Sequence, residues 1–324
     1  MPALSEPILA ALRACFGATA PTDGEPLGGG LSGTPLVTVN HGGRRYVVRH
    51  VDGARPFDAP AQQIACLTAA AEAGVAPPVR WADPASGVVV MDYIAPAEGR
   101  GWLRDPAGIA RVAALFRRLH GGPAFAPFIA VADALPTMLA RLTDLGVAPP
   151  PLREAAPAFP AIAAALARHA EPRPCHHDAN PGNLLFDGER LWLVDWELAG
   201  AGDPFYDLGT LCVYAYPGPE ERALLLASYL ERPPTPAERA RLAVATAQAL
   251  AFYAVVFATI ATLRPGAAPG PFPAEEDVPT LIGAQSLAPA RGDAPDPARM
   301  GAVLAWELAR VVRSDAHREA LALL

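Results

Sequence analysis

The chain has 324 residues, of which 52% are hydrophobic and 18% are charged, a composition typical of a globular protein with one large or two modest domains. All 26 of its basic residues are arginines, and with 33 acidic residues the formal net charge is −7. This acidic balance argues against nucleic acid as the main partner and favours small cationic ligands, and any site that needs a cationic side chain must use arginine.

The amino-terminal part of the chain is predicted to form a small sheet with helices. A short amphipathic helix is expected over 6–16, and two β-branched runs joined by a Gly-Gly turn predict strands over 37–40 and 44–51. A helix over 59–74 follows, with Gly74 as its stop signal. The stretch "PPVRWADPASGVVVMDYI" then predicts two more strands around a turn.

The remainder of the chain is predicted to be mainly helical. Periodicity and capping signals predict helices over 106–120, 134–145, 152–170, 204–215, 219–231, 235–263 and 296–323. One hairpin, "NLLFDGERLWLVDW", interrupts them and turns at Asp187-Gly188. The expected fold class is therefore α+β.

Three features of the sequence lead us to expect a cytoplasmic protein. No basic start precedes an apolar run at the amino terminus, so no signal peptide is expected. Residues 242–263 carry no charge and are long enough to span a membrane, but their many Ala and Thr residues favour a buried helix and no membrane partner. The four cysteines have no paired spacing, which predicts free thiols in a reducing compartment.

A cluster of small polar residues, "CHHDANPGNLLFDGERLWLVDW", lies at residues 175–196. Asp178 precedes a Pro-Gly turn, Asn183 follows it, and Asp195 ends the second strand of the hairpin. Strand pairing is expected to bring Asn183 and Asp195 together, and their oxygens suit Mg²⁺, which takes one or two carboxylates from protein. Asp178 would then orient a hydroxyl and accept its proton, a division of roles that phosphoryl transfer requires.

This pattern resembles the protein-kinase-like small-molecule phosphotransferases, in particular their aminoglycoside phosphotransferase and choline/ethanolamine kinase branch. The resemblance rests on three motifs: His176-x-Asp178-x4-Asn183, Asp195-Trp196-Glu197 and Pro204-x-x-Asp207-Leu208. It covers roughly residues 24–260 and implies a bilobal fold, with a nucleotide-binding lobe over 1–94 and a catalytic and substrate lobe over 95–324. No Ala-Pro-Glu segment follows, which disfavours a protein kinase.

The resemblance implies roles for the residues of these motifs. It implies ATP and Mg²⁺ as cofactors, Asp178 as the catalytic residue, and Asn183 and Asp195 as the metal ligands. His176 is expected to pack behind the catalytic loop, and Asp207 to hold that loop by hydrogen bonds. Two roles are open for Glu197: it could lie beside the metal or face the substrate.

The nucleotide is expected to bind to the amino-terminal lobe. The loop "LGGGLSG", with Gly29 and Gly30, could bring backbone amides to the phosphates. Arg49 on the following strand is the candidate phosphate clamp, since its planar fork suits phosphate oxygens. Backbone groups from Asp92 to Ile94 are expected to bond the adenine edge.

The helix over 59–74 departs from the family pattern at the position that usually provides an acid for the clamp. Gln63 stands there, and it can hydrogen-bond Arg49 but cannot neutralise its charge. Either Asp58 or Glu72 substitutes for the missing acid, or the clamp is held more loosely.

The acceptor is expected to be a hydroxyl on a small cationic molecule, most simply choline, ethanolamine or a similar amino alcohol. A quaternary ammonium binds to aromatic faces; the candidates are Tyr206, Tyr214, Tyr216, Phe252, Tyr253 and Trp306. The alternatives are an aminoglycoside or other amino sugar, and a nucleotide-binding pseudokinase, which the Gln63 departure favours. A His/Asp metal phosphohydrolase is disfavoured because the other histidines form no spaced pairs. The sequence does not indicate an oligomeric state.

Overall fold

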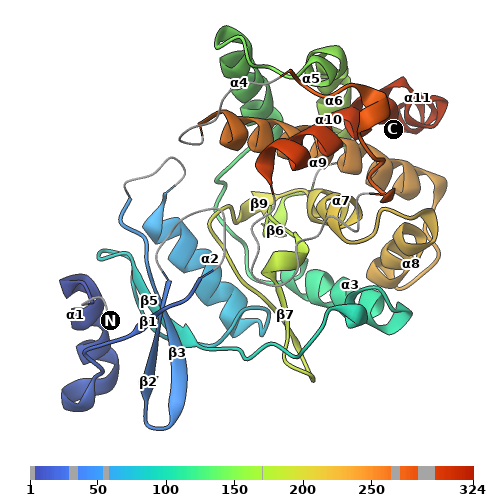
Figure 1. Ribbon diagram of the computed structural model, residues 1–324. Helices are drawn as coiled ribbons and strands as arrows, with labels where there is room; N and C mark the ends of the chain where they lie inside the picture. Colours follow the sequence, from blue (N-terminus) through green and yellow to red (C-terminus); the bar gives the residue numbers. More distant parts are fainter. Residues whose placement is uncertain (1–3, 29–35, 54–57, 170, 264–270, 284–295) are drawn as a thin grey trace.

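The computed structural model describes residues 4–28, 36–53, 58–169, 171–263, 271–283 and 296–324. The amino-terminal lobe contains a five-stranded antiparallel sheet of order β1-β2-β3-β5-β4 (Figure 1). Its strands are β1 Glu25–Pro26, β2 Leu36–His41, β3 Arg44–His50, β4 Val79–Asp83 and β5 Val88–Asp92. Helix α1 Glu6–Phe16 covers one face of this sheet and helix α2 Pro60–Glu72 the other.

The inner strand β5 is apolar along most of its length because both faces of the sheet are covered. Successive side chains of a strand point to opposite faces. Val88 and Val90 pack with the residues of α1, whereas Val89 and Met91 pack with those of α2. This explains why "VVVM" shows no alternation between apolar and polar residues.

The β2–β3 hairpin brings Arg49 to the middle of the sheet. Its turn uses Gly42 at φ 56° and Gly43 at φ 75°, the two positive values that a tight hairpin turn requires. The resulting register places Arg49 opposite Leu36 on one side and opposite Val89 of β5 on the other.

The carboxyl-terminal lobe is mainly helical. Its helices are α3 Pro106–His120, α4 Val131–Asp144, α5 Pro150–Ala155, α6 Phe159–Ala167, α7 Pro204–Tyr214, α8 Pro219–Leu230, α9 Pro236–Leu263, α10 Pro297–Arg313 and α11 Asp315–Ala322. Two small ribbons lie beneath them: β6 Arg173–Cys175 with β9 Gly200–Gly202, and β7 Leu184–Phe186 with β8 Leu191–Leu193. The sheet lobe and the helical lobe together confirm the predicted α+β, protein-kinase-like fold.

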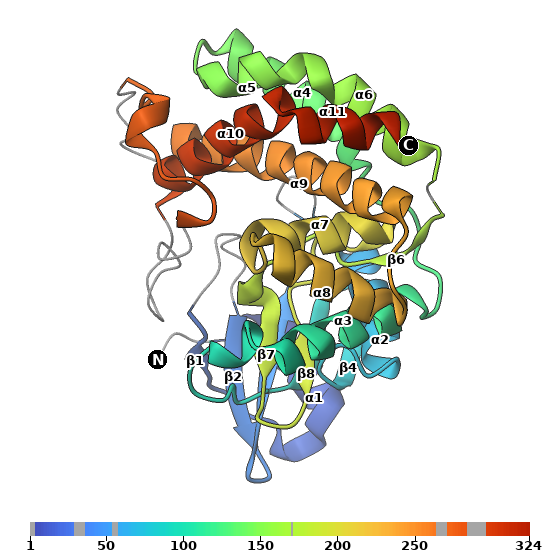
Figure 2. The ribbon, with the colours of Figure 1, turned by 90° about the vertical axis from the view of Figure 1, so that its right-hand side faces the viewer.

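Helix α9 is the central element of the helical lobe (Figure 2). It packs against α10 and α7 and also contacts α11, α6 and α4. A window of this helix is apolar enough to cross a membrane by composition, but 78% of that window is buried inside the protein, as in the core helix of a large domain. At Gly209 of α7 the backbone of α9 comes so close that a Cβ atom would lie 2.7 Å from the carbonyl of Ala245.

Two of the helices predicted from the sequence are broken in the structure. The segment predicted as one helix over 152–170 consists of α5 and α6 joined by a 3₁₀ turn, Ala156–Ala158, where a proline lies in the first turn of α6 and removes a backbone donor. The segment predicted as one helix over 296–323 breaks at Ser314. The backbone of Ser314 is extended, and its Oγ caps α11 by accepting the N–H of His317 at 3.1 Å.

Candidate active site

The loop between β6 and β7 carries Asp178, whose carboxylate accepts three side-chain hydrogen bonds. Oδ2 accepts Nδ2 of Asn183 at 2.8 Å, and Oδ1 accepts Nδ2 of Asn180 at 3.0 Å and the hydroxyl of Tyr253 at 2.7 Å. Asn183 Nδ2 also donates to the carbonyl of Asp178 at 2.9 Å. Because the Asn183 amide nitrogen is used in this way, its oxygen is oriented away from Asp178 and remains available to a cation.

Asp207 of α7 holds the start of this loop from below. Its fully buried carboxylate accepts the backbone N–H groups of His176 and His177, each at 2.8 Å, and lies 3.1 Å from Nε2 of His120. Burial raises the pKa of Asp207, but hydrogen bonding and charge from His120 outweigh burial and leave the pKa below its usual value. The ionised carboxylate therefore fixes His177 in a left-handed conformation, φ 63°, which a non-glycine residue seldom adopts.

The structure places His176 behind the loop. Its Nδ1 accepts the N–H of Asp178 at 3.3 Å, so Nε2 carries the proton and donates it to the carbonyl of Val194 at 2.9 Å. The ring also packs edge-on against Trp196, with centroids 4.8 Å apart. The ring of His176 thus connects the loop to the chain that leaves β8.

Asp195 lies beside Asn183, two residues after the end of β8. The N–H of Val194 donates to the carbonyl of Asn183 at 3.0 Å, which brings the two candidate metal ligands to neighbouring backbone positions. Asp195 is also held in a left-handed conformation, φ 66°. Backbone strain of this kind costs about 1–3 kcal/mol and concentrates at functional sites.

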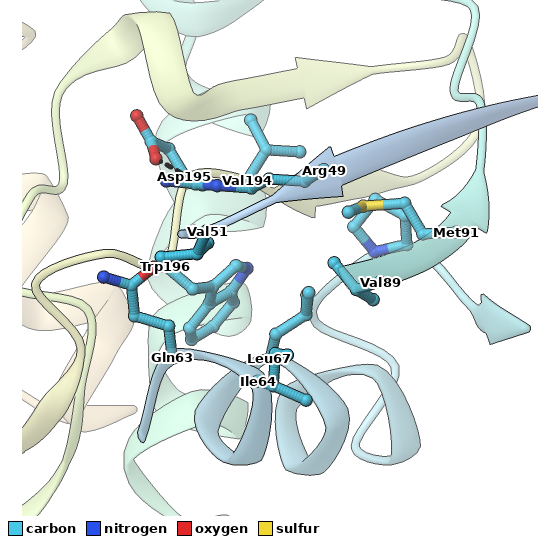
Figure 3. A pocket seen from close by; sticks show the side chains of 11 residues that line it. Arg49, Val51, Gln63, Ile64, Leu67, Val89, Met91, Val194, Asp195 and Trp196 are labelled. Atoms are coloured by element: carbon cyan, nitrogen blue, oxygen red, sulfur yellow. Dashed lines mark hydrogen bonds and ion pairs between the residues drawn. The ribbon is translucent and has the colours of Figure 1, made fainter. Parts of the chain in front are cut away.

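Arg49 reaches from β3 to two carboxylates of the opposite lobe. Its Nη1 lies 2.8 Å from Oδ1 of Asp195 and its Nη2 lies 3.2 Å from Oε2 of Glu197 (Figure 3 shows the pair with Asp195). The guanidinium is largely buried, with 11% of the side chain exposed. Burial, followed by the nearby Asp195, raises the pKa of Glu197 to about 7, although Arg49 acts in the opposite direction.

Among the ion pairs of Arg49, Asp195 and Glu197 supply the carboxylates, and Glu197 is the one outside the candidate metal ligands. Glu72, one of the two expected substitutes, is exposed on α2. Gln63 is buried and lines the same small cavity as Arg49 and Asp195, with Ile64 and Leu67 beside it (Figure 3). The cavity measures roughly 30 Å³, room for about one water molecule, so it is a gap behind the clamp and not a nucleotide pocket.

In the segment after β5, the predicted adenine contact, the N–H and the carboxylate of Asp92 are engaged within the amino-terminal lobe. The N–H of Asp92 donates to the carbonyl of Pro78 at 2.9 Å, and its carboxylate accepts Nε of Arg80 at 2.7 Å. Within the described part of the chain the N–H of Ile94 has no acceptor, so it is available to a ligand. The predicted phosphate-loop residues Gly29 and Gly30 lie outside the described residues.

Aromatic side chains of α7 and α9 pack against one another next to the loop that carries Asp178. Tyr214 meets Tyr253 edge-on at 4.9 Å, and Tyr206 meets His177 edge-on at 5.8 Å and Phe252 at 6.3 Å. The buried hydroxyl of Tyr206 has no hydrogen-bond partner among the described residues. Burial, together with the nearby Asp178 carboxylate, raises the pKa of Tyr206 well above its usual value.

The other two aromatic candidates make different contacts. Tyr216 belongs to a different part of the core, where burial and the nearby Glu221 raise the pKa of its phenol. Trp306 of α10 donates its ring N–H to the carbonyl of Pro273 at 3.0 Å. Tyr216 therefore lies outside the aromatic group around Asp178, whereas Trp306 packs against the hydrophobic cluster that contains Tyr206, Phe252 and Tyr253 without a ring contact to them among the described residues.

One group of possible metal ligands lies beneath the catalytic loop, where His120, Cys175 and Asp207 come within 4.8 Å of one another. Both oxygens of Asp207 already accept backbone N–H groups. Burial, followed by the charge of Asp207, raises the pKa of the Cys175 thiol well above its usual value, which disfavours the thiolate that a metal needs. The group is a structural junction and gives no support to a phosphohydrolase centre.

The motifs and the geometry agree with what known proteins show. The sequence model of the phosphotransferase enzyme family matches residues 23–244. The chain belongs to this family. Its members are phosphotransferases of kinase-like fold, which implies ATP as the phosphoryl donor, and a LicA structure in complex with AMP has a similar fold, with 18% identity and a TM-score of 0.57.

Among solved structures, a choline/ethanolamine kinase family protein from Mesorhizobium loti is 26% identical, with a TM-score of 0.72 over 97% of this chain and 96% of that chain. Choline kinase LicA from Streptococcus pneumoniae is 17% identical, with a TM-score of 0.59 over 76% of this chain and 88% of that chain. The gentamicin complex of APH(2")-IIa is 16% identical, with a TM-score of 0.56 over 82% and 93%. The two structures of lower identity show the fold alone.

A curated relative matches over a short segment. Protein LicA of Haemophilus influenzae is 40% identical over 57 residues, which is 18% of this chain and 21% of LicA. The match therefore spans about a fifth of the relative's length.

Sequence reasoning missed two partners of Asp178, namely Asn180 in the same loop and Tyr253, which it named only as an aromatic candidate for the substrate. The sequence marks Tyr253 only as one of several aromatic residues in a long apolar helix. The contact of Tyr253 with Asp178 depends on how α9 packs over the catalytic loop, which no local pattern records.

Proposed function

We propose that the protein transfers the γ-phosphoryl group of ATP, with Mg²⁺, to a hydroxyl of a small cationic molecule, an amino alcohol such as choline or ethanolamine. The observation that carries the proposal is the meeting of Asp178, Asn183 and Asp195 at one end of the cleft, with Arg49 arriving from the opposite lobe. This set contains the base, the oxygen ligands and the cation that phosphoryl transfer requires.

The donor set fits Mg²⁺, which prefers oxygen ligands and keeps several waters. The free amide oxygen of Asn183 and the carboxylate of Asp195 would hold the ion, which supplies charge neutralisation on the phosphates when it is bound. Arg49 would exchange part of its contact with Asp195 for phosphate oxygens while it keeps Glu197. A bidentate guanidinium suits both partners.

Asp178 would receive the acceptor. Its carboxylate is oriented by Asn180, Asn183 and Tyr253, so a hydroxyl that donates to it is fixed in one direction. As the oxygen attacks the γ-phosphorus, its proton passes to Asp178 and ADP departs. The backbone N–H of Ile94 would bond the adenine edge and align the phosphates with this acceptor.

The charge and the shape of the acceptor side support a cationic alcohol. Asp178 and Asp195 give this part of the site negative charge, and Arg49 lies between Asp195 and Glu197. Tyr206, Tyr214 and Tyr253 place aromatic rings near Asp178, and a quaternary ammonium binds favourably to aromatic faces. The likeness over nearly the whole chain to a choline/ethanolamine kinase family protein points in the same direction.

An aminoglycoside or other amino sugar is the second candidate. The same acidic cleft would attract its ammonium groups, and a gentamicin-bound phosphotransferase shares the fold. A pseudokinase is less well supported, because Glu197 supplies Arg49 with the acid that Gln63 lacks.

The test is a screen of ADP release with choline, ethanolamine and aminoglycosides, followed by two variants. Asp178→Ala should abolish turnover while ATP still binds, and Asp195→Ala should remove the Mg²⁺ dependence of nucleotide binding. Asp187→Ala, at the exposed hairpin turn, is the matched control because it also removes a carboxylate that accepts N–H groups. ATP binding without transfer to any acceptor would favour the pseudokinase, and normal turnover by Asp178→Ala would refute the assigned base.

A further inference from the structure

Tyr253 makes a direct contact with the candidate base that the proposed reaction does not itself require. Its hydroxyl lies 2.7 Å from Oδ1 of Asp178 and 3.3 Å from the carbonyl of His177, and the residue is 6% exposed. Burial, followed by the charge of Asp178, raises the pKa of Tyr253 well above its usual value, so the phenol keeps its proton at neutral pH. Tyr253 is therefore a hydrogen-bond donor to Asp178, and the nearer acceptor is the carboxylate.

This contact completes the hydrogen bonds that one of the two carboxylate oxygens of Asp178, Oδ1, can accept. A carboxylate offers about four accepting positions, two on each oxygen. Asn180 and Tyr253 both donate to Oδ1, whereas among the described side chains only Asn183 donates to Oδ2. One accepting position therefore remains, on Oδ2, the oxygen on the side of the candidate metal ligand.

We propose that the Tyr253 hydroxyl occupies the second accepting position on Oδ1 of Asp178. Only one position, on Oδ2, is then left to accept the proton of a nucleophile. The inference rests on the proposed phosphotransferase function and adds to it a residue that decides which nucleophile is used. Tyr253 is a positioning residue: it directs the acceptor hydroxyl to Oδ2 and keeps water from a second position on the base.

Without the Tyr253 hydroxyl, Oδ1 has an open position in a partly buried site. A buried acceptor without its partner recruits water where there is room. A water molecule that donates to Oδ1 can pass its proton to Asp178, the same base that the acceptor hydroxyl uses. Its oxygen forms a bond to the γ-phosphorus of ATP, the bond between that phosphorus and the ADP oxygen breaks, and the water proton passes to Asp178. The products are ADP and inorganic phosphate, so ATP is hydrolysed without transfer.

The test compares Tyr253→Phe with wild type and with Tyr216→Phe as the matched control. Tyr216 has a buried hydroxyl without a hydrogen-bond partner among the described residues, and it lies away from the aromatic group around Asp178. ADP release and phosphorylated acceptor are measured together, with the acceptor found in the screen and also without any acceptor. In heavy-oxygen water, the released phosphate shows whether water was the nucleophile.

For Tyr253→Phe we expect the ratio of phosphorylated acceptor to ADP to fall roughly ten-fold, the typical effect of one hydrogen bond to a charged group. Release of labelled phosphate without acceptor should rise, and Tyr216→Phe should keep the wild-type ratio. The ratio does not depend on how much of a variant is folded, so a loss of stability alone leaves it unchanged. An unchanged ratio in Tyr253→Phe, with wild type active on its acceptor, overturns this inference alone, whereas a wild type that transfers to no hydroxyl overturns the proposed function.

Discussion

Replacement of Asp207 by asparagine tests whether a buried charge holds the catalytic loop. The fully buried carboxylate accepts two backbone N–H groups at 2.8 Å and lies 3.1 Å from the His120 ring. Asparagine is nearly isosteric but provides one accepting oxygen, and its NH₂ group would face one of those donors. Asp207→Asn therefore removes the charge and at least one hydrogen bond without changing the packed volume.

The cost follows from the typical contributions of these groups. Hydrogen bonds to a charged group contribute about 1.5–3 kcal/mol each, and a buried donor without an acceptor costs about 1–3 kcal/mol. Removal of one partner from a buried charge pair typically costs about 3–5 kcal/mol. For Asp207→Asn we therefore expect the free energy of unfolding to fall by about 3–5 kcal/mol, together with a loss of phosphoryl transfer because His176 and His177 are released.

The assay is urea unfolding at neutral pH, with the midpoint and slope compared between variants. Asp187→Asn is the control, because that exposed carboxylate also accepts two backbone N–H groups, from Glu189 at 2.9 Å and Arg190 at 2.7 Å, together with the ring N–H of Trp192 at 2.7 Å, but has no buried charge partner among the described residues. The control should lose no more than about 1 kcal/mol. If Asp207→Asn lost no more than Asp187→Asn, the loop would not be held by this charge.

The same reasoning fixes a pH dependence. The folded pKa of Asp207 lies below its usual value, so the folded state favours the ionised form. Its contribution to stability is present above the unfolded pKa, about 3.9, and is lost as the pH falls through the lower folded value. Acid unfolding of Asp207→Asn should lack this component.

Three further predictions concern Glu197, Gln63 and Gly209. The raised pKa of Glu197, about 7, means that the folded state binds a proton more tightly than the unfolded state. The free energy of unfolding should therefore decline as the pH rises from about 4.3 towards 7. When unfolding is measured in EDTA, Glu197→Gln should reduce this decline, and an unchanged profile would contradict the assignment. Glu197→Gln should also raise the Kd for ATP by about ten-fold, because Arg49 loses a partner. Gln63→Glu in that background should restore affinity, measured by calorimetry, whereas further weakening would show that position 63 cannot serve Arg49. Gly209→Ala should lower the midpoint of thermal unfolding, because its Cβ would lie 2.7 Å from the backbone of Ala245, and the free energy of unfolding should fall by about 1–3 kcal/mol or more. An unchanged midpoint would show that α7 and α9 can move apart at this point at no cost.

The local motifs made much of this site predictable from the sequence. Asp178, Asn183 and Asp195 lie within one short stretch, so a single hairpin brings them together. The position of Arg49 followed from the β2–β3 hairpin, whose Gly-Gly turn fixes the register. In both cases contacts near in sequence determine the arrangement.

The features that sequence reasoning missed depend on contacts between distant segments. The pair of Arg49 with Glu197 crosses the two lobes, and a missing acid at Gln63 does not indicate which other acid replaces it. Tyr253 reaches Asp178 only because α9 packs over the loop. The break at Ser314 did have a local signal, a serine whose side chain caps the next helix, but the apolar periodicity on both sides obscured it.

The close approach of α7 and α9 at Gly209 has a consequence for motion during the reaction cycle. Asp207 on α7 and Tyr253 on α9 both make hydrogen bonds to the segment that carries Asp178. At Gly209 the backbones of the two helices lie in direct contact. Helices in such contact cannot slide or tilt separately without opening a void. The helical lobe should therefore move as one rigid body during the reaction cycle. Any opening that admits the nucleotide should come from a rotation of the amino-terminal sheet about the segment that follows β5.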